Sequence, residues 1–258
     1  MQVQQHWIET PEGTLFAQSW DVEQGQGAPV VLLHDSLGCV ALWRDFPERL
    51  AQATGRKVIA YDRLGFGRSA RHSGTLSLSF VEDEAKGDFQ AVCQFFKLHS
   101  FVVFGHSVGA GMAIGCAGAH ANCQGVITES AQAFVEALTL DGIRQAKQTF
   151  TEAGQMQRLE KYHGDKAQWV LHAWTDTWLS DEFSDWRLDE QLRQVSCPVL
   201  ALHGDSDEFG TTHHLERIAE QVKAPVSLHV LADCGHVPHR QYPDAVLERV
   251  CMFLSPLA

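Results

Sequence analysis

The sequence has little positive charge for its length. Its 258 residues include 20 lysines and arginines against 32 aspartates and glutamates, which gives a formal net charge of −12. Phosphate backbones and anionic membrane surfaces repel a chain of this sign, whereas solubility is favoured by it. We therefore expect neither a nucleic acid nor a membrane as a partner.

Paired cysteines and a leading targeting segment are absent as well. The seven cysteines are odd in number and include no C-x-x-C pair, and a chain of this length does not need disulfides to stabilise its core. The first residues, MQVQQHWIETPEG, contain neither the basic segment nor the apolar run of a secretory signal. Both absences argue against a disulfide-rich secreted domain, and we expect a cytoplasmic protein.

Charge is missing altogether from one long stretch. No Asp, Glu, Lys or Arg occurs between Leu98 and Thr128, which is long enough to suggest a membrane span. Histidine, serine, asparagine and glutamine interrupt the stretch, however, and glycine is frequent in it. A buried strand, a tight turn and a buried helix explain this composition better, so we expect a soluble protein.

Short apolar runs alternate with helical patterns along the chain. The turn signal Pro11-Glu12-Gly13 between His6–Thr10 and Leu15–Trp20 predicts a hairpin. Six further runs follow: Val30–His34, Val58–Tyr61, Phe101–Gly105, Gly125–Thr128, Val199–His203 and Ser227–Leu231. Runs without polar alternation suit strands that are buried on both faces. We therefore predict an α/β fold with a mostly parallel, doubly wound sheet of about eight strands, which binds ligands at the carboxyl ends of its strands.

Two regions between the strands are helical. Ser79 and Glu82 have the spacing of a capping box, which predicts a helix from Ser79 through Phe96. Residues 131–193 hold helical patterns and four of the seven tryptophans, and they are too long for a simple crossover. We expect them to form a cap that is inserted between two parts of the core, residues 1–130 and 194–258.

The sharpest motif is the G-x-S-x-G sequence from Gly105 to Gly109. It follows an apolar strand and precedes a helix rich in alanine and glycine. A sharp strand-to-helix turn holds its serine in a strained conformation, and the flanking glycines leave room for the turn. The amide of Val108 then lies at a helix N-terminus, where it can stabilise an oxyanion. This context predicts that Ser107 is a nucleophile.

A serine hydroxyl needs a base and an orienting acid to react at neutral pH. Asp205 and Asp207 follow the apolar strand that begins at Val199, and His236 follows a later strand in a Gly-His turn. The resulting order Ser, Asp, His is the one typical of a nucleophile elbow in an α/β sheet.

With these segments the sequence resembles the α/β-hydrolase family over essentially its full length. The matching segments are His34–Gly38, Asp62–Ser69, the elbow, Gly204–Asp207 and Gly235-His236. Within the family, the sequence is most similar to the branch of capped serine esterases that includes valacyclovir hydrolase. The resemblance implies that Ser107 is the nucleophile, His236 the base and Asp207 the acid, because the family spacing G-x-x-D favours Asp207 over Asp205.

Two other side chains remain candidates for these roles. Some relatives place the acid at the end of the preceding strand, where Glu129 stands, and His239 is a rival of His236 that lacks the preceding glycine. The other twelve histidines are interpreted as surface or packing residues. Because neither an HExxH nor an HxHxD pattern occurs, we expect no metal, and the resemblance implies no cofactor.

The resemblance also implies a second oxyanion donor, the amide of Ser36. Asp35 stands beside it where the family has a glycine, and aspartate tolerates a left-handed backbone better than most residues. A carboxylate near a developing oxyanion is unfavourable unless it is paired or points away. Two interpretations stay open: Asp35 shapes its own loop by hydrogen bonding, or it receives a cationic or hydroxylated substrate.

The tryptophans of the predicted cap bear on the substrate. Trp174 and Trp178 are four residues apart and share a helix face, with Trp169 one turn earlier. This stripe is either an apolar lid over an acyl or aromatic group, with Trp174 and Trp178 as substrate contacts, or a packing surface against the core. Both interpretations stay open, and the aromatic content favours a neutral, partly apolar substrate.

These patterns lead to one main hypothesis and two alternatives. The main one is a serine hydrolase that cleaves a small to medium carboxylic ester, thioester or amide through an acyl-enzyme. The alternatives are hydrolysis of a C–C bond in a vinylogous diketone and a non-catalytic binding member of the fold. Haloalkane dehalogenases and epoxide hydrolases use an aspartate at the elbow, which Ser107 argues against. The expected partner is a small-molecule ester, and the expected assembly is a monomer or homodimer.

Overall fold

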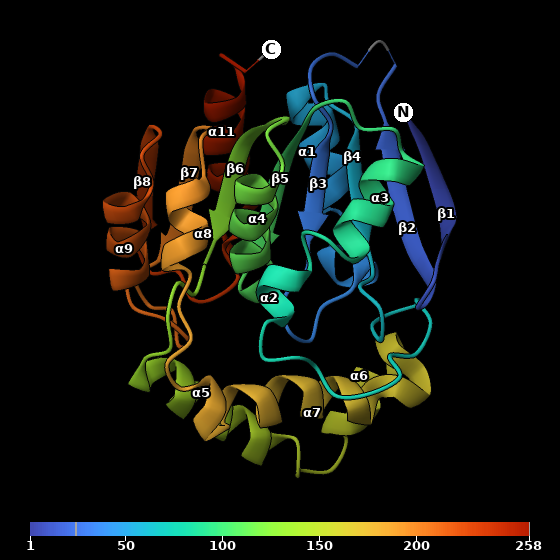
Figure 1. The fold of residues 1–258 in the computed structure, drawn as a ribbon, viewed down its shortest axis with the longest axis vertical. Helices are drawn as coiled ribbons and strands as arrows, with labels where there is room; N and C mark the ends of the chain where they lie inside the picture. The colour runs from blue at the N-terminus through green and yellow to red at the C-terminus, as the bar shows by residue number, and fades with distance from the viewer. Residues whose placement is uncertain (24, 258) are drawn as a thin grey trace.

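The computed structural model describes residues 1–23 and 25–257, whose strands form an eight-stranded sheet in the order β1-β2-β4-β3-β5-β6-β7-β8 (Figure 1). The strands are β1 (Gln2–Thr10), β2 (Gly13–Asp21), β3 (Val30–Leu33), β4 (Val58–Tyr61), β5 (Phe101–His106), β6 (Cys123–Glu129), β7 (Val199–Gly204) and β8 (Val226–Leu231). The β1–β2 hairpin is antiparallel and joins β4 antiparallel, whereas β4, β3 and β5 to β8 run parallel. The predicted fold class is confirmed.

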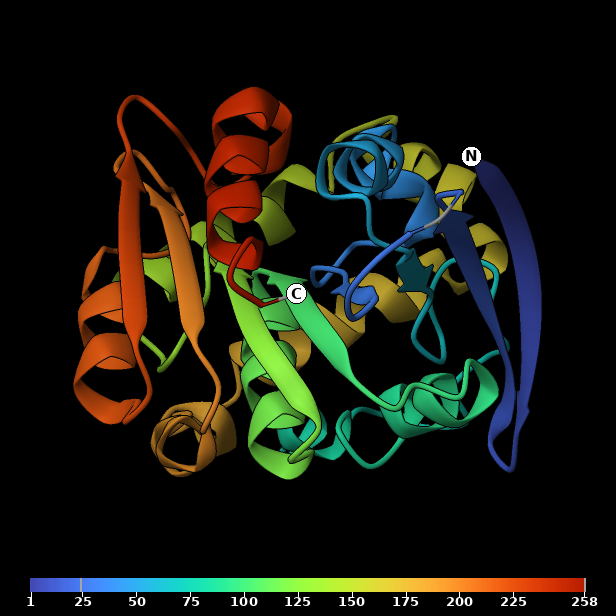
Figure 2. The same cartoon turned by 90° about the horizontal axis from the view of Figure 1, so that it is seen from above.

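Helices cover both faces of this sheet (Figure 2). One face is covered by α1 (Phe46–Thr54) and α11 (Pro243–Leu254). The other is covered by α2 (Phe80–Asp83), α3 (Asp88–Phe95), α4 (Val108–Ala119), α8 (Asp189–Gln194) and α9 (His213–Gln221). Strands β3, β4, β5 and β7 are buried at every position, which explains their uninterrupted apolar sequences.

Strand β8 departs from this pattern. It was expected to be buried on both faces, but it lies at the edge of the sheet, and Leu228 and Val230 are exposed. An edge strand has a neighbour on one side only, so the burial expected from its apolar sequence is wrong for β8.

The helix predicted from Ser79 to Phe96 is two helices, α2 and α3, separated at Gly87. The hydroxyl of Ser79 donates to the carboxylate of Asp83 at 2.7 Å instead of capping a backbone amide. Between the helices, the chain turns Glu84 inward, where its carboxylate accepts a short hydrogen bond from the Tyr61 hydroxyl. This buried contact with β4 is a tertiary effect that the helical pattern does not contain, and the capping-box prediction is wrong.

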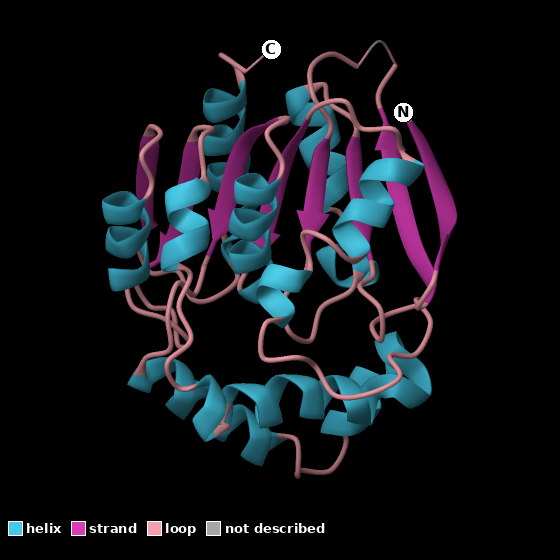
Figure 3. Cartoon of the chain, viewed as in Figure 1, coloured by secondary structure: helices cyan, strands magenta, loops and turns pink. Residues whose placement is uncertain are grey.

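A layer of helices lies beyond the carboxyl ends of the parallel strands (Figures 1 and 3). It consists of α5 (Ala137–Thr149), α6 (Gln155–His163) and α7 (Ala167–Trp178), with the 3-10 turn η2 (Gly164–Lys166) before α7. We call residues 137–178 the cap. The limits of the inserted unit, predicted at residues 131 and 193, stay a prediction.

The remaining short helices lie in loops near the strand ends: η1 (Val40–Trp43), η3 (Asp181–Phe183) and α10 (Pro238–Gln241). The uncharged stretch from Leu98 to Thr128 forms β5, a turn, α4 and most of β6, as expected. Across residues 1–23 and 25–257, no helix has the length and apolar character that crossing a bilayer requires.

Candidate functional site

Ser107 stands alone between β5 and α4. Its backbone has φ 57° and ψ −125°, a conformation that is strained for a residue with a side chain. A Cβ atom on Gly105 would lie 2.0 Å from the carbonyl oxygen of Gly109, and one on Gly109 would lie 2.2 Å from that of Leu33. Both glycines are therefore required by close backbone approach, and the predicted tight elbow is confirmed.

The structure joins Ser107, His236 and Asp207 in a chain of hydrogen bonds. His236 Nε2 lies 2.9 Å from the Ser107 hydroxyl oxygen, and His236 Nδ1 lies 2.8 and 2.9 Å from the two carboxylate oxygens of Asp207. All three residues are buried. Burial by itself would raise the pKa of Asp207, but its hydrogen bond with His236 and the charge of that ring lower it. The carboxylate is thus ionised and fixes the orientation of the imidazole.

The rival residues lie elsewhere. Asp205 is exposed, and its carboxylate accepts a hydrogen bond from the adjacent Ser206 hydroxyl at 3.0 Å. Glu129 contacts His239, whose Nδ1 lies 2.5 Å from the Glu129 carboxylate. The geometry therefore pairs Asp207 with His236 and separates Glu129 and His239 from the serine. The catalytic roles of these residues stay predictions.

Two backbone amides are free near Ser107. Val108 is the first residue of α4, so its N–H group has no acceptor within the helix. Within the described part of the chain, neither Val108 nor Ser36 has a hydrogen-bond acceptor for its amide. Ser36 lies in the loop of residues 34–38, which we name the oxyanion loop for its predicted role. Ser36 lines the same cavity as Ser107, and Val108 follows Ser107 directly, so both amides remain candidates for the predicted oxyanion hole.

Asp35 is held by two contacts. Its Oδ1 accepts the Leu37 amide at 3.0 Å, and its Oδ2 lies 3.3 Å from His106 Nδ1. Burial would raise the pKa of Asp35, but the hydrogen bond and charge of His106 hold it well below its usual range. Asp35 shapes its own loop, as the first of the two interpretations expected, and it still borders the cavity beside Ser107.

A cavity of about 150 Å³ lies between Ser107 and the cap. It is lined by Asp35, Ser36, Leu37, Ser107, Gln132, Ile143, Trp174, Phe209 and His236. Four of these side chains are apolar or aromatic, and the lining contains neither lysine nor arginine. Gln132 Oε1 lies 3.4 Å from the Ser107 hydroxyl oxygen, which brings an amide group to the edge of the reacting centre.

A family model described as the alpha/beta hydrolase family matches residues 30–249. The chain belongs to the α/β-hydrolase family. It is 23% identical over 261 residues to a 2-hydroxy-6-oxo-6-(2'-aminophenyl)hexa-2,4-dienoic acid hydrolase from Metapseudomonas resinovorans, which covers 91% of this chain and 86% of that protein. It is 25% identical over 234 residues to a non-heme haloperoxidase from Rhodococcus erythropolis, covering 79% and 82% of the two chains.

Solved structures agree with the family at the level of the fold. A thermophilic esterase from Thermogutta terrifontis superposes with a TM-score of 0.74 at 20% identity, and the match covers 98% of this chain and 99% of the esterase. A proline iminopeptidase from Mycobacterium smegmatis has a TM-score of 0.73 at 20% identity, with 98% of each chain covered. These likenesses show that the whole chain has the hydrolase architecture.

The tryptophans of the cap lie in different surroundings. Trp174 lines the cavity. Trp178 does not: it is 2% exposed and packs its ring 5.5 Å from that of Trp186. Trp169 donates its indole N–H to the carbonyl of Gly74 at 2.7 Å. Trp178 therefore lies in the core and outside the cavity lining, as the packing interpretation expects, and its contact with substrate stays a prediction.

His163 connects the cap to the oxyanion loop. Its Nδ1 accepts the Gly67 amide at 2.8 Å, and its Nε2 donates to the Leu37 carbonyl at 3.0 Å. Burial lowers the pKa of His163, which suits a neutral ring that accepts at one nitrogen and donates at the other. From the sequence, His163 and His106 are expected to be surface or packing residues only. No signal in a single sequence distinguishes them, because their partners lie far away along the chain.

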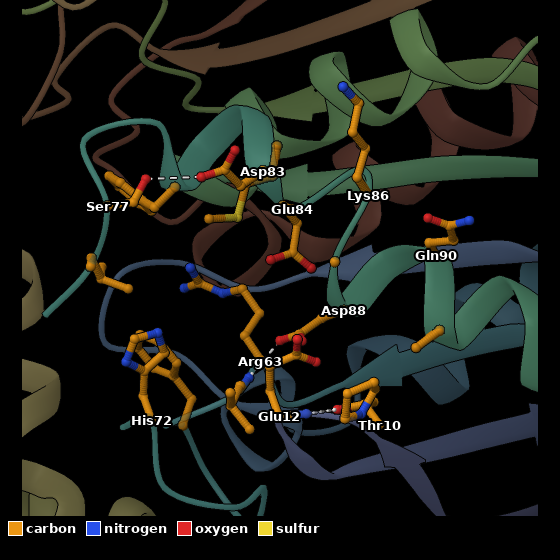
Figure 4. Close-up of a pocket in the computed structure, with 18 of the residues that line it drawn as sticks. Thr10, Glu12, Arg63, His72, Ser77, Asp83, Glu84, Lys86, Asp88 and Gln90 are labelled. Carbon is orange, nitrogen blue, oxygen red and sulfur yellow. Dashed lines mark hydrogen bonds between the residues drawn. The ribbon is translucent and has the colours of Figure 1, made fainter. Parts of the chain in front are cut away.

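A larger cavity of about 540 Å³ lies between the β1–β2 hairpin and helices α2 and α3 (Figure 4). Figure 4 shows the side chains of Arg63 and Glu84 directed toward the same space. Burial, with the charge of nearby Asp88, raises the pKa of Glu84 to about 8. Arg63 donates to the carbonyl oxygen of Asp35 at 2.8 Å. Arg63 thus connects the wall of this cavity to the oxyanion loop.

One group of side chains has the composition of a metal site. The ligand atoms of His106, Glu129 and His239 lie within 4.8 Å of one another. Both ring nitrogens of His106 are engaged, however, by Asp35 and by the His236 carbonyl, and His239 is bonded to Glu129. Hydrogen bonding accounts for these side chains, and we assign them no metal.

Proposed function

We propose that the protein is a serine hydrolase that cleaves small to medium carboxylic esters through an acyl-enzyme. The observation that carries this proposal is the hydrogen-bonded chain of Ser107, His236 and Asp207 beside the free amides of Ser36 and Val108. A hydroxyl, an imidazole and a carboxylate in this order form the minimal apparatus of serine acyl transfer. A non-catalytic role would not require all five groups to converge.

The first half of the reaction acylates the serine. The Ser107 oxygen attacks the ester carbonyl carbon while Nε2 of His236 takes the hydroxyl proton. The carbonyl electron pair moves to oxygen, where the amides of Ser36 and Val108 bind the negative charge. When the carbonyl re-forms, the alkoxide leaves with the proton from His236. Asp207 stabilises the imidazolium during these steps.

The second half hydrolyses the acyl-enzyme. His236 takes a proton from a water molecule, whose oxygen attacks the acyl carbon and forms a second oxyanion in the same pair of amides. The bond to the Ser107 oxygen then breaks, the serine regains its proton from His236, and the carboxylic acid leaves. Each half therefore uses the same three side chains in the same positions.

The cavity supports a small, neutral acyl group. Its volume of about 150 Å³ and its walls of Leu37, Ile143, Trp174 and Phe209 suit a short apolar chain or a single ring. The negative charge of Asp35 disfavours an anionic acyl group there. Esters of uncharged acids are therefore the proposed substrates, with small thioesters as a chemically close extension.

Hydrolysis of a C–C bond is the second candidate. The relative from Metapseudomonas resinovorans, named as a hydrolase of a hydroxy-oxo-dienoic acid, favours it. Such a substrate is an acid, and its carboxylate would need a cation. Because the lining of the cavity contains Asp35 and no lysine or arginine, ester cleavage is the better-supported proposal.

Hydrolysis of p-nitrophenyl esters from acetate to laurate tests the proposal, with Ser107→Ala compared with the parent protein. We expect turnover on the shorter esters and a loss of at least about a thousandfold in the variant. Ser227→Ala, at an exposed position of β8, is the matched control and should keep full activity. A fluorophosphonate should label the parent and the control but not Ser107→Ala.

Two outcomes would redirect the proposal. A folded parent protein that reacts with the fluorophosphonate but cleaves no ester would reject ester hydrolysis, and a vinylogous diketone would be assayed next. A parent protein that reacts with neither would favour the non-catalytic alternative.

A further inference from the structure

His106, the residue before the predicted nucleophile, lies under the site rather than in it. Its side chain is 2% exposed. Nδ1 lies 3.3 Å from a carboxylate oxygen of Asp35, and Nε2 lies 2.8 Å from the backbone carbonyl oxygen of His236. One ring thus contacts two separate loops, the oxyanion loop and the loop that carries the predicted base.

The contact with the carbonyl requires His106 to donate, and the contact with Asp35 favours a second proton on the ring. A carbonyl oxygen has no proton, so Nε2 must carry the hydrogen of the bond to His236. The Asp35 carboxylate lies 3.3 Å from Nδ1, at ion-pair distance, where its negative charge stabilises a proton on that nitrogen. An imidazole that donates from both nitrogens holds two protons and is positively charged.

The electrostatic surroundings of His106 agree with this charge. It is faced by Asp35 from the oxyanion loop, by Glu129 from the end of β6, by the His236 ring and by His239 from α10. Burial by itself would lower the pKa of His106, but the hydrogen bond and charge of Asp35, aided by Glu129, raise it. The pKa of His239 is lowered by burial, so a neutral His239 adds no opposing positive charge.

We propose that His106 is a doubly protonated positioning residue that holds the oxyanion loop through Asp35 and the His236 loop through its carbonyl. The inference rests on the proposed serine hydrolase for its catalytic consequence, but the charge of the ring can be observed without turnover. The imidazolium also compensates the carboxylate that replaces the family's glycine. A negative charge next to the Ser36 amide is then tolerated when an oxyanion forms.

Nitrogen-15 NMR of the histidine rings tests the charge directly. His106→Gln identifies the signals of residue 106 by their disappearance. We expect both of its ring nitrogens to be protonated from pH 6 to 8 in the parent, and one to lose its proton within this range in Asp35→Asn. His172→Gln is the matched control, because His172 is exposed on the cap with Asp176 3.9 Å away. A parent His106 with one unprotonated nitrogen at pH 7 would overturn the proposal.

Kinetics test the positioning. Asp35→Asn and His106→Gln should each lower kcat by about tenfold to a hundredfold with little change in KM, because misplaced groups affect the transition state more than binding. The kcat of the double variant should be no lower than that of the less active single variant, because each single change already breaks the same coupled pair. In Asp35→Asn, activity should also fall as the pH rises through the lowered pKa of His106. The pH profile of the parent should not show this fall.

The controls separate this inference from the proposed function. His172→Gln should keep the parent values of kcat and KM, and circular dichroism must show that each variant is folded. Losses that multiply in the double variant, or an unchanged charge of His106 in Asp35→Asn, would reject the coupling. If Ser107→Ala abolishes ester cleavage but His106 is neutral, only this inference fails. If His106 is charged and no ester is cleaved, the ester proposal fails instead.

Discussion

Glu129 and His239 form a hydrogen-bonded pair that is closed off from solvent. Nδ1 of His239 lies 2.5 Å from the Glu129 carboxylate, and the two side chains are 3% and 0% exposed. Burial would raise the pKa of Glu129, but its contact with His239 and the charge of His106 lower it. Because His239 is bonded to Glu129, neither competes for the serine or its base, and the pair joins β6 to α10.

Glu129→Gln should therefore reduce stability and leave the catalytic pH profile intact. Glutamine keeps the shape but removes the charge, so we expect the free energy of unfolding to fall by about 2 kcal/mol. Urea denaturation and the pH dependence of kcat measure the two effects. A folded Glu129→Gln that had lost all turnover would instead make Glu129 the orienting acid.

The contacts of Glu136 lead us to expect a loss of stability in acid. Its carboxylate accepts the Thr211 amide and hydroxyl at 2.6 and 3.0 Å and lies 3.0 Å from Nε2 of His214. Burial alone would raise the pKa of Glu136, but these contacts lower it from 4.5 to about 2. A folded-state pKa below the unfolded value stabilises the protein above pH 4.5, and this stabilisation is lost as the pH falls toward 2.

Glu136→Gln tests this pH dependence. The variant should be less stable than the parent at neutral pH, and the difference between the two should shrink as the pH falls through this window. Thermal unfolding at a series of pH values measures it. A constant difference at every pH would show that Glu136 contributes through packing alone.

Trp174 and Trp178 should respond differently to the same substitution. Trp174→Ala enlarges the cavity beside Ser107, so the preferred p-nitrophenyl ester should become longer, with a smaller loss of stability than for the buried Trp178. Trp178→Ala removes a fully packed ring, and we expect a loss of about 3–5 kcal/mol in the free energy of unfolding with no change in ester preference. The ester profile and a urea titration of both variants decide the matter. Equal shifts in chain-length preference would contradict the assignment of Trp178 to the core.

His163→Ala should slow the reaction although His163 does not line the cavity. It removes the bond to the Leu37 carbonyl and leaves the oxyanion loop less firmly held, so kcat should fall by about tenfold with KM little changed. His172→Ala, which removes an exposed histidine from the same cap, should have no such effect. A change in KM alone would indicate that His163 acts on the substrate wall instead.

The sheet and the elbow could be predicted because their causes are local. Apolar runs mark buried strands, and Gly105 and Gly109 are fixed by steric contacts within one motif and its neighbouring strand. Asp207 and His236 each stand in a short motif as well, Gly204–Asp207 and Gly235-His236. The structure brings these two side chains together, as the resemblance to the family implied.

The features that escaped prediction depend on contacts between distant segments. The inward turn of Glu84 toward Tyr61 divides a helix whose pattern looked continuous. Likewise, the pairing of His106 with Asp35 joins residues that are 71 positions apart, and His163 reaches 126 positions back to Leu37. Such pairs carry no periodicity, and only the folded arrangement defines them.

The two hydrogen bonds of His163 have a consequence for how this protein can change. The cap is joined by this residue to the loop beneath it, so it is not an interchangeable module. Replacing residues 137–178 with the cap of another family member would alter turnover as well as substrate range, unless the donor supplied a histidine at the same place. Evolution or engineering that reshapes the substrate wall is therefore free to vary Trp174 and constrained to keep His163.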